Sequence, residues 1–339
     1  MSMRSVCFGE LLLRLSAPRR ERLLQSPSLE VCVGGAEANV AVALARFGED
    51  AAMISVVPNN DLGEAAVGEL RRHGVDVSRV ATRAGRMGLY FLEAGALHRP
   101  SQVLYDRANS AFALAPPESY DWPRLLDAAD VLVISGVTAA VGANGAAAAI
   151  ACARAARSRG MHVVFDGNFR AKLWQAWGGD ARSILGELFA CADTVFADHR
   201  DIAIVLGREF SDAATGNAGR AAADAAFATF PQLTRIIATL RVQHTVDHHE
   251  LSGVLHTRAG SIETDAYAIT PIIDRIGAGD AFAAGVLHCL FDGRSDSDAL
   301  HFGLAAGCLK HSVPGDFLRM SAAEVAEFLD ERRRFDVKR

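Results

Sequence analysis

A short glycine-rich segment near the C-terminal end of the chain combines residue types that suit phosphoryl transfer. The segment Gly277–Asp280 reads Gly-Ala-Gly-Asp, and Phe282, Val286 and Cys289 recur after it at helical spacing. Small residues at a helix entry let backbone N–H groups approach an anion, and the helix dipole favours negative charge there. The carboxylate of Asp280 on the first turn would accept the proton of an attacking hydroxyl. Alone, these residues indicate only a glycine-rich turn with an aspartate cap.

A second glycine pair opens a predicted helix near the N-terminus. Gly34 and Gly35 precede a segment in which Val40, Leu44 and Phe47 share one helical face. The glycines permit a close backbone approach, and the nearby Asn39 offers both a donor and an acceptor to sugar hydroxyls. This motif is also weak evidence when it is taken alone.

The elements that would position these motifs alternate between strands and helices. Apolar strand-like runs are separated by helical patterns, which is typical of a sheet flanked by helices in an α/β fold. Asp61 and Glu64 predict a capping box at the start of one of the helices. The clearest predicted strands are Ser5–Phe8, Val131–Ser135, His162–Phe165, Thr194–Ala197 and Arg235–Leu240.

Two stretches break this alternation, at about residues 11–33 and 87–107. Both contain extended segments with mixed faces, such as Leu89–Glu93 (Leu-Tyr-Phe-Leu-Glu). We expect them to form a small sheet that projects from the main body and is inserted in two pieces. With no linker or repeat elsewhere, residues 1–339 are predicted to form a single domain.

The composition excludes several classes of protein. The chain has 339 residues, half of them apolar, and a net charge of -5, so nothing favours nucleic-acid binding. Its six cysteines form no CxxC pair, and no apolar run is long enough to cross a membrane. We therefore expect a cytoplasmic protein with reduced thiols that binds a small molecule.

Together, the two glycine motifs, about 240 residues apart, resemble the ribokinase-like (PfkB) carbohydrate kinase family. The resemblance also includes Gly9-Glu10 and Asp166-x-Asn168-x-Arg170, and it runs over nearly the whole chain. It implies a doubly wound α/β body with a small β-sheet lid. It also implies that ATP and Mg²⁺ are used, with the metal carried by ATP and not by a dedicated protein site. The resemblance assigns the catalytic base to Asp280 and the anion hole to Gly277, Ala278 and Gly279.

Within that family, the 2-keto-3-deoxygluconate kinases are the branch that the chain resembles most. Supporting segments include Tyr105–Ala108, Phe165–Arg170, Asp274–Gly277 and Lys310–Asp316. The implied reaction is phosphorylation of the 6-hydroxyl of 2-keto-3-deoxygluconate. The residues implied to bind the sugar acid are Gly34, Gly35, Asn39, Tyr90, Tyr105, Arg107 and Arg170.

The chemistry of the implied substrate supports this assignment. The sugar acid carries a carboxylate, and arginine holds carboxylates through paired hydrogen bonds. Arg107 and Arg170 would supply two such contacts, for which fructose and ribose have no use. The arginines do not distinguish epimers, so 2-keto-3-deoxygalactonate remains an alternative substrate. Fructose and ribose remain alternatives that the two arginines disfavour. Tyr90 and Tyr105 would combine a ring face with a hydroxyl.

The nucleotide side departs from the usual family pattern. Asp198 and Asp201 stand where the family carries Asn-x-x-Glu, beside Asp166 and Asn168 of the preceding motif. Two carboxylates can still orient water around Mg²⁺, but the change leaves open a non-catalytic sugar-acid-binding protein. Further nucleotide-side candidates are Thr239 and Arg241, and Arg275-Ile276 replaces a common threonine pair, which leaves monovalent-cation use open.

A histidine pair, the turn after the first strand and the surface of the lid carry three further predictions. His244 and His248 have a metal-capable spacing, but the segment reads as a hairpin loop between strands, which disfavours a zinc site. A nicotinamide-dependent dehydrogenase is rejected because the first strand is not followed by a GxGxxG turn. Apolar residues exposed on the lid favour a homodimer, or a larger homo-oligomer, formed through it.

Overall fold

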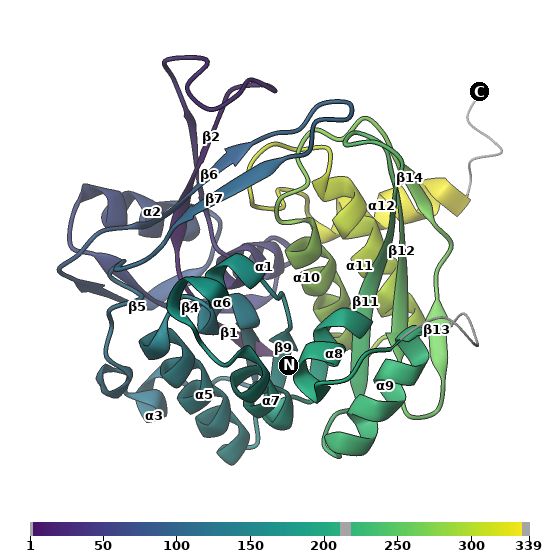
Figure 1. Cartoon of the computed structure of the whole chain (residues 1–339). Coiled ribbons are helices and arrows are strands. Elements are labelled where there is room, and N and C mark those ends of the chain that lie inside the picture. Colours follow the sequence, from purple (N-terminus) through teal and green to yellow (C-terminus); the bar gives the residue numbers. More distant parts are fainter. Residues whose placement is uncertain (1–2, 211–217, 334–339) are drawn as a thin grey trace.

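The computed structural model describes residues 3–210 and 218–333, and side chains only up to residue 330 in the last helix. The protein is built around one large twisted sheet (Figure 1). Ten strands form this sheet in the order β13-β12-β11-β10-β9-β8-β1-β4-β5, with β14 paired to β12. The strands from β11 to β5 are parallel, whereas β12, β13 and β14 extend one edge in antiparallel fashion. The strands are β1 (Arg4–Phe8), β4 (Asp50–Pro58), β5 (Asp76–Arg83), β8 (Val131–Ser135), β9 (His162–Asp166), β10 (Thr194–Phe196), β11 (Arg235–Gln243), β12 (His249–His256), β13 (Ser261–Glu263) and β14 (Tyr267–Ile269).

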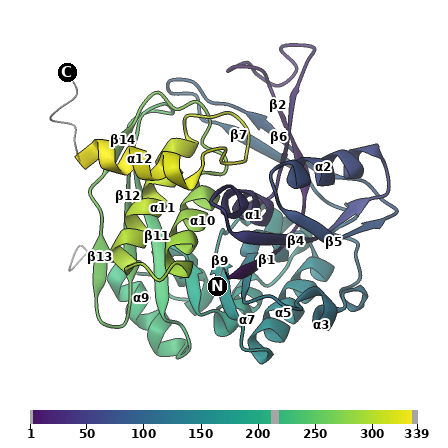
Figure 2. The same ribbon diagram turned by 180° about the vertical axis from the view of Figure 1, so that it is seen from behind.

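Helices cover both faces of this sheet, as the opposite views in Figures 1 and 2 show. One face carries α1 (Ala36–Arg46), α2 (Asp61–Arg72), α10 (Ala278–Phe291), α11 (Asp296–Lys310) and α12 (Ala322–Arg333). The other carries α3 (Trp122–Leu125), α4 (Gly136–Ala139), α5 (Ala143–Ser158), α6 (Ala171–Trp177), α7 (Ala181–Cys191), α8 (His199–Leu206) and α9 (Ala218–Thr229), with a short 3₁₀ turn at Pro117–Ser119.

The central strands are apolar on both faces because both faces are covered. In β8, Leu132 and Ile134 point into the core beneath α5 and α7, whereas Val131 and Val133 point into the core beneath α1 and α10. This two-residue alternation is the ordinary geometry of a strand. It confirms the predicted doubly wound α/β fold.

The predicted strands are confirmed, with small differences at their ends. The strand predicted over Arg235–Leu240 continues to Gln243 because it pairs with β12 in a long hairpin. The capping box predicted at Asp61 and Glu64 is wrong, because α2 begins one residue earlier than predicted. Asn60 is the N-cap, its side chain accepts a hydrogen bond from the N–H of Gly63, and Asp61 is already the first helical residue.

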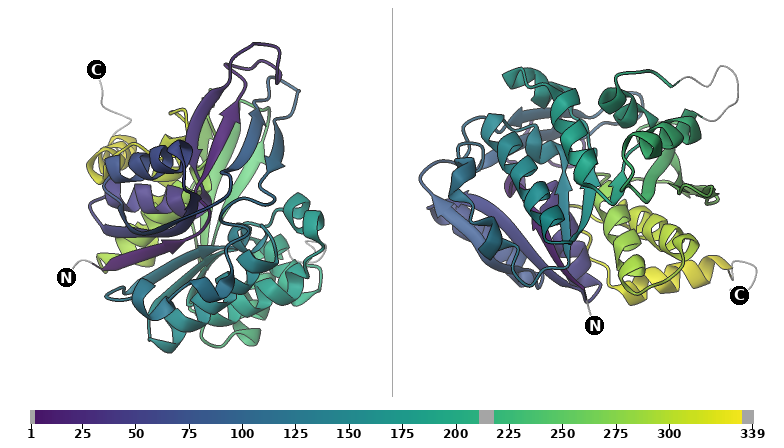
Figure 3. Two further views of the ribbon diagram at one scale, coloured as in Figure 1. Left: turned by 90° about the vertical axis from the view of Figure 1, so that its left-hand side faces the viewer. Right: turned by 90° about the horizontal axis from the view of Figure 1, so that it is seen from below.

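A second, small sheet projects from the carboxyl edge of the parallel strands (Figure 3). It has the strand order β3-β2-β6-β7 and is drawn from the two irregular stretches predicted to form it. β2 follows β1 after only three residues, so the small sheet begins where the main strands end. Its strands are β2 (Leu12–Ser16), β3 (Glu30–Gly34), β6 (Gly88–Glu93) and β7 (Gln102–Asp106).

The two faces of the small sheet differ in character. Directly paired residues point to the same face, so the register places Cys32, Arg14, Tyr90 and Tyr105 in one row across the four strands. The neighbouring row, on the opposite face, consists of Val31, Leu15, Phe91 and Leu104. The first row is polar and turned toward the body, and the second is apolar, with Val31 and Leu104 each 60% exposed at its ends.

All six cysteines are free thiols, and all except the half-buried Cys32 are buried. No helix within the described ranges is long and apolar enough to cross a membrane.

Candidate active site

The two glycine motifs meet in space at the N-terminal ends of α1 and α10. The side-chain N–H of Asn39 donates to the Oδ2 atom of Asp280 at 2.6 Å, across 241 residues of sequence. Asn39 is 4% exposed, and its Oδ1 atom is buried and has no hydrogen-bond partner among the described residues. An acceptor of this kind, held beside a carboxylate, is suited to receive a ligand hydroxyl.

The entry of α10 has the geometry of an anion-binding helix terminus. Gly277 is the N-cap with φ 80°, a left-handed conformation that favours glycine. A Cβ atom there would lie 1.9 Å from the backbone oxygen of Asp316, so no side chain fits. The N–H of Ala278 donates to the carbonyl of Arg275 at 3.3 Å, while a Cβ atom at Gly279 would meet open space. The first N–H groups of a helix have no intrahelical acceptor and are available to phosphate oxygens.

Acidic side chains gather around this entry. Burial raises the pKa of Asp280 to about 6, although its hydrogen bond from Asn39 and the charge of Arg170 both lower it. Burial also raises the pKa of Asp201 to about 6 and that of Asp166 well above its usual range, helped by the charge of Asp280. Carboxyl groups with raised pKa values in one place are typical of sites that handle protons.

These residues lie where the parallel strands end. Asp166 is the last residue of β9, Asp198 follows β10, and Thr239 lies in β11. Ligands of open α/β sheets bind in the crevice outside the carboxyl ends of the strands. Asn168 follows β9 with φ 41°, a left-handed conformation that asparagine tolerates, so the turn points the chain back over this edge.

The acidic pair predicted on the metal side, Asp198 and Asp201, forms a capping box at the start of α8. Asp198 accepts hydrogen bonds from the N–H groups of Arg200 and Asp201, and Asp201 accepts one back from the N–H of Asp198 at 3.3 Å. The Arg200 guanidinium also bonds Asp198. Both carboxylates are thus used in capping the helix. Within the described ranges, no three His, Cys, Asp or Glu side chains are placed to hold a metal ion.

Two of the residues predicted to bind the sugar acid, Arg107 and Tyr90, already have protein partners. Arg107 is 6% exposed, and its Nε atom pairs with Glu10 at 2.6 Å. The hydroxyl of Tyr90 donates to Asp316 at 2.8 Å. Tyr105 and Arg107 line a cavity of about 320 Å³ between β7 and α6, which Lys172 also lines.

Arg170 is exposed, and its side chain bonds only the backbone oxygen of Phe169 among the described residues. Its charge lowers the pKa of both Asp280 and Asp166. Arg170 therefore lies close enough to Asp280 for its charge to act on that carboxyl group, whereas Arg107 pairs with Glu10.

The first glycine pair is tightly confined. Gly35 caps α1 with φ 145°, and a Cβ atom there would lie 2.3 Å from the backbone oxygen of Glu10. A Cβ atom at Gly34 would lie 2.2 Å from the carboxylate of Asp316. Both positions need glycine, and they directly precede the helix that carries Asn39.

Sequence reasoning assigned no role to four charged residues that border the same place: Arg14, Asp274, Lys310 and Asp316. All except Asp274 are nearly or fully buried. Arg14 lies on β2 and pairs with Asp274 at 2.6 Å and with Asp316 at 3.2 Å. One signal was available for Arg14, since it interrupts the apolar run Leu11–Leu15.

Arg241 lies exposed on the β11–β12 hairpin, and its pKa is lowered by partial burial and by the charges of Arg275 and Arg200. The hairpin predicted around His244 and His248 is confirmed, since β11 ends at Gln243 and β12 begins at His249. The ring of His244 contacts Glu250 at 3.1 Å.

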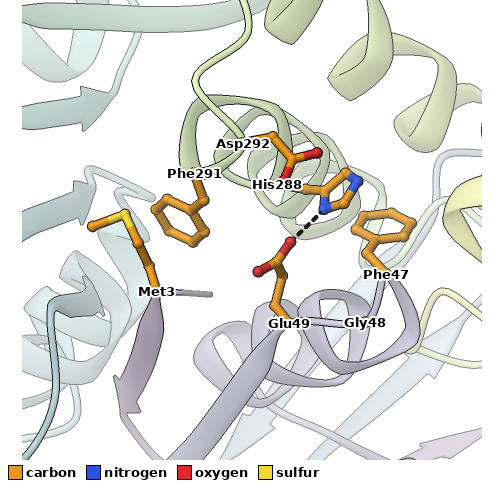
Figure 4. A pocket seen from close by; sticks show the side chains of 7 residues that line it. All are labelled: Met3, Phe47, Gly48, Glu49, His288, Phe291 and Asp292. Carbon is orange, nitrogen blue, oxygen red and sulfur yellow. Dashed lines mark hydrogen bonds and ion pairs between the residues drawn. The ribbon is translucent and has the colours of Figure 1, made fainter. Parts of the chain in front are cut away.

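A separate pocket lies at the opposite end of α10 (Figure 4). Its centre is the contact between His288 and Glu49, whose side-chain atoms are 2.6 Å apart. His288 is eight residues after Asp280, so about 12 Å of helix separates the two. None of the predicted site residues lines this pocket.

Comparisons with known proteins show the family of the chain. Residues 3–318 match the model of the pfkB family carbohydrate kinases. The chain is 34% identical to a 2-dehydro-3-deoxygalactonokinase from Haloferax volcanii, over 97% of each chain. It is 29% identical to a 2-dehydro-3-deoxygluconokinase from Bacillus subtilis, over 98% of this chain and 97% of the relative. The crystal structure of the Thermotoga maritima 2-dehydro-3-deoxygluconokinase superposes with a TM-score of 0.90 at 36% identity, over 97% of this chain and 99% of that one. The chain belongs to the pfkB family of carbohydrate kinases, which are ATP-dependent transferases.

Proposed function

We propose that the protein transfers the γ-phosphoryl group of ATP to the 6-hydroxyl of 2-keto-3-deoxygluconate, also written 2-dehydro-3-deoxygluconate. The observation that carries the proposal is the hydrogen bond between Asn39 and Asp280, which joins the two glycine motifs into one site. The named relatives, which are kinases of 2-keto-3-deoxy sugar acids, support the class of substrate.

In the proposed mechanism, Asp280 accepts the proton of the 6-hydroxyl as that oxygen attacks the phosphorus atom. Asn39 holds the carboxylate in place, and the first N–H groups of α10 stabilise charge on the transferring group. Mg²⁺ bound to ATP would neutralise the phosphate oxygens. The small sheet, acting as a lid over the site, would exclude water and limit ATP hydrolysis.

Arginine charges are proposed to hold the acid end of the substrate. Arg107 and Tyr105 line the cavity between β7 and α6, Tyr90 is the cross-strand neighbour of Tyr105, and the charge of Arg170 acts on Asp280. These observations support the proposal that the four residues bind the sugar acid. Binding energy at the carboxylate would then orient the distant hydroxyl toward Asp280. On the nucleotide side we propose Asp166, Asn168, Asp198, Asp201, Thr239 and Arg241, with Asp198 and Asp201 acting through the start of α8.

The second candidate substrate is 2-keto-3-deoxygalactonate, which is favoured by the 34% identity to the Haloferax enzyme. The test is a coupled ADP-release assay with Mg·ATP on both epimeric acids, fructose and ribose. We expect kcat/KM for one of the keto-deoxy acids to exceed those for both neutral sugars. A preference for fructose or ribose would contradict the roles proposed for the arginines. Calorimetric binding of an acid without turnover would indicate a non-catalytic binder.

A further inference from the structure

Building on the proposed kinase activity, we propose that Arg14 is a positioning residue for phosphoryl transfer. It extends from the small sheet and holds the two aspartates that fix the entry of α10, so that seating of the small sheet sets the geometry of the anion hole.

Arg14 is buried between two carboxylates. It is 3% exposed, its Nη2 atom lies 2.6 Å from Asp274 and its Nη1 atom lies 3.2 Å from Asp316. Although burial opposes the charge, the two carboxylates raise the pKa of Arg14 above its usual range. A buried guanidinium between two carboxylates is strongly coupled to both, because removing it leaves two partly or fully buried negative charges unpaired.

The two aspartates fix the position of the chain at the entry of α10. Asp274 accepts hydrogen bonds from the N–H groups of Ile276 and Gly315, both at 3.0 Å. It therefore ties the loop that leads into Gly277 to the segment that carries Asp316. The backbone oxygen of Asp316 lies directly against Gly277, where a Cβ atom would approach it to 1.9 Å. A shift of either aspartate must move the N-cap of α10.

Asp316 also contacts a second residue of the small sheet and the first glycine motif. The Oδ2 atom of Asp316 accepts the Tyr90 hydroxyl at 2.8 Å and would lie 2.2 Å from a Cβ atom at Gly34. Arg14 and Tyr90 are direct cross-strand neighbours in the row that faces the body. The small sheet thus reaches Asp316 through two side chains at once, and both glycine motifs touch that residue.

A second buried cation lies behind this group. Lys310, at the end of α11, is fully buried and donates to the backbone oxygen of Val313 at 3.1 Å. Burial lowers its pKa, while Asp274, Asp316 and Asp280 favour its charge. Lys310 is part of the body, so Arg14 is the cation whose contact with the aspartates depends on the small sheet.

The experiment compares Arg14→Ala and Arg14→Lys with the wild type on whichever sugar acid the wild type phosphorylates fastest. The matched control is Arg99→Ala, because Arg99 also lies in the small-sheet region. Its side chain pairs with Glu93 at 2.6 Å and donates to the backbone oxygen of Arg20 at 2.6 Å, and within the described ranges it bonds neither Asp274 nor Asp316. We expect Arg14→Ala to lower kcat by about 100-fold, since misplacing catalytic groups by about 1 Å has that effect. KM for ATP should change far less, and Arg99→Ala should keep a kcat close to that of the wild type.

The distinguishing readout is chemical rescue. Guanidinium chloride, at concentrations that leave the wild type folded, should restore at least part of the kcat of Arg14→Ala, whereas sodium chloride at equal ionic strength should not. Arg14→Lys keeps one charge but loses the forked geometry, so its kcat should be intermediate. A wild-type kcat in Arg14→Lys and Arg14→Ala would overturn the proposal, as would a rise in KM for the sugar acid alone.

If Arg14→Ala does not fold in a thermal melt, the kcat of Arg14→Lys decides between these outcomes. The activity of the wild type is measured first. If the wild type phosphorylates no sugar acid, the proposed function is contradicted, and the variants are not compared.

Discussion

Asp280 and Asn39 form the contact on which the proposed chemistry depends. Replacing Asp280 with asparagine keeps the side-chain shape and can still accept the hydrogen bond from Asn39, but removes the base. We expect kcat to fall by about 10²- to 10⁴-fold, the usual contribution of a general base.

Stability gives the control for this variant. Burial raises the pKa of Asp280, so folding disfavours the charged form at neutral pH, and the Asp280→Asn substitution removes that penalty. The midpoint of thermal unfolding at pH 7 should therefore stay unchanged or rise. A lower midpoint together with lost activity would indicate a structural role for Asp280.

The same carboxyl group predicts an acidic limit to activity. A base must be ionised, and the pKa of Asp280 is about 6, because burial outweighs the opposing effects of Asn39 and Arg170. Below that pH the ionised fraction falls about tenfold per unit. We expect log kcat/KM for the sugar acid to decline with unit slope below about pH 6. A profile that stays flat to pH 5 would argue against Asp280 as the base.

Individual residues also show the limits of sequence reasoning. The spacing of the glycines predicted a helix entry, and the structure confirms that Gly277 caps α10. The role of Asp280 as the base came only from the resemblance of the two motifs, taken together, to a known family, and it stays a prediction. The Asp198–Asp201 pair was interpreted only as part of the metal and nucleotide side, and the structure shows that the two side chains also form a capping box. The Arg14 network joins positions up to 302 residues apart, from Arg14 to Asp316, and no local pattern indicates which carboxylates a buried arginine meets.

Among the elements, the small sheet is held over the body at its far end as well as at its base. Arg20 forms an ion pair with Asp247 of the β11–β12 hairpin and donates to the backbone oxygen of Ile272 at 3.1 Å. The N–H of Val246 donates to the backbone oxygen of Leu97 at 3.3 Å. These contacts connect the far end of the small sheet to the β11–β12 hairpin and to the segment that follows β14.

Arg20→Ala should loosen this connection without unfolding the protein. The side chain of Arg20 is 38% exposed, so the lost ion pair contributes about 0–1 kcal/mol to the free energy of unfolding. We expect faster hydrogen exchange of amides around Leu97 and Val246 and a higher rate of ATP hydrolysis without sugar, because water is excluded less well. Unchanged exchange and unchanged hydrolysis would mean that this contact does not keep the small sheet closed.

The elements themselves were largely predictable. Alternating apolar strands and helices, and the two irregular stretches that form the small sheet, follow from periodicity in the sequence. The end of β11 and the cap of α2 were misplaced, because hairpin pairing with β12 and the side chain of Asn60 decide those boundaries.

For the whole molecule, the apolar row on the outer face of the small sheet supports the prediction of a homodimer. Val31 and Leu104 are each 60% exposed, with Leu15 and Phe91 between them in the same row. Burying such a row against a second copy would remove apolar surface from water.

Leu104→Lys would place a charge in that interface. We expect sedimentation to show a dimer for the wild type and a monomer for Leu104→Lys, while Leu62→Lys remains dimeric. Leu62 is a suitable control because it is 53% exposed and belongs to α2, which is not part of the small sheet. A monomeric wild type, or a Leu104→Lys dimer, would contradict dimerisation through the small sheet.

The position of the phosphate on the product shows whether the protein phosphorylates the 6-hydroxyl of the sugar acid. The wild type would be incubated with Mg·ATP and 2-keto-3-deoxygluconate, and the phosphorylated product would be examined by phosphorus–proton correlation NMR. We expect a phosphorus nucleus coupled to the two protons of the C6 methylene group, and no such signal with Asp280→Asn. Coupling to a single proton on C4 or C5, or an equal signal from the variant, would contradict it.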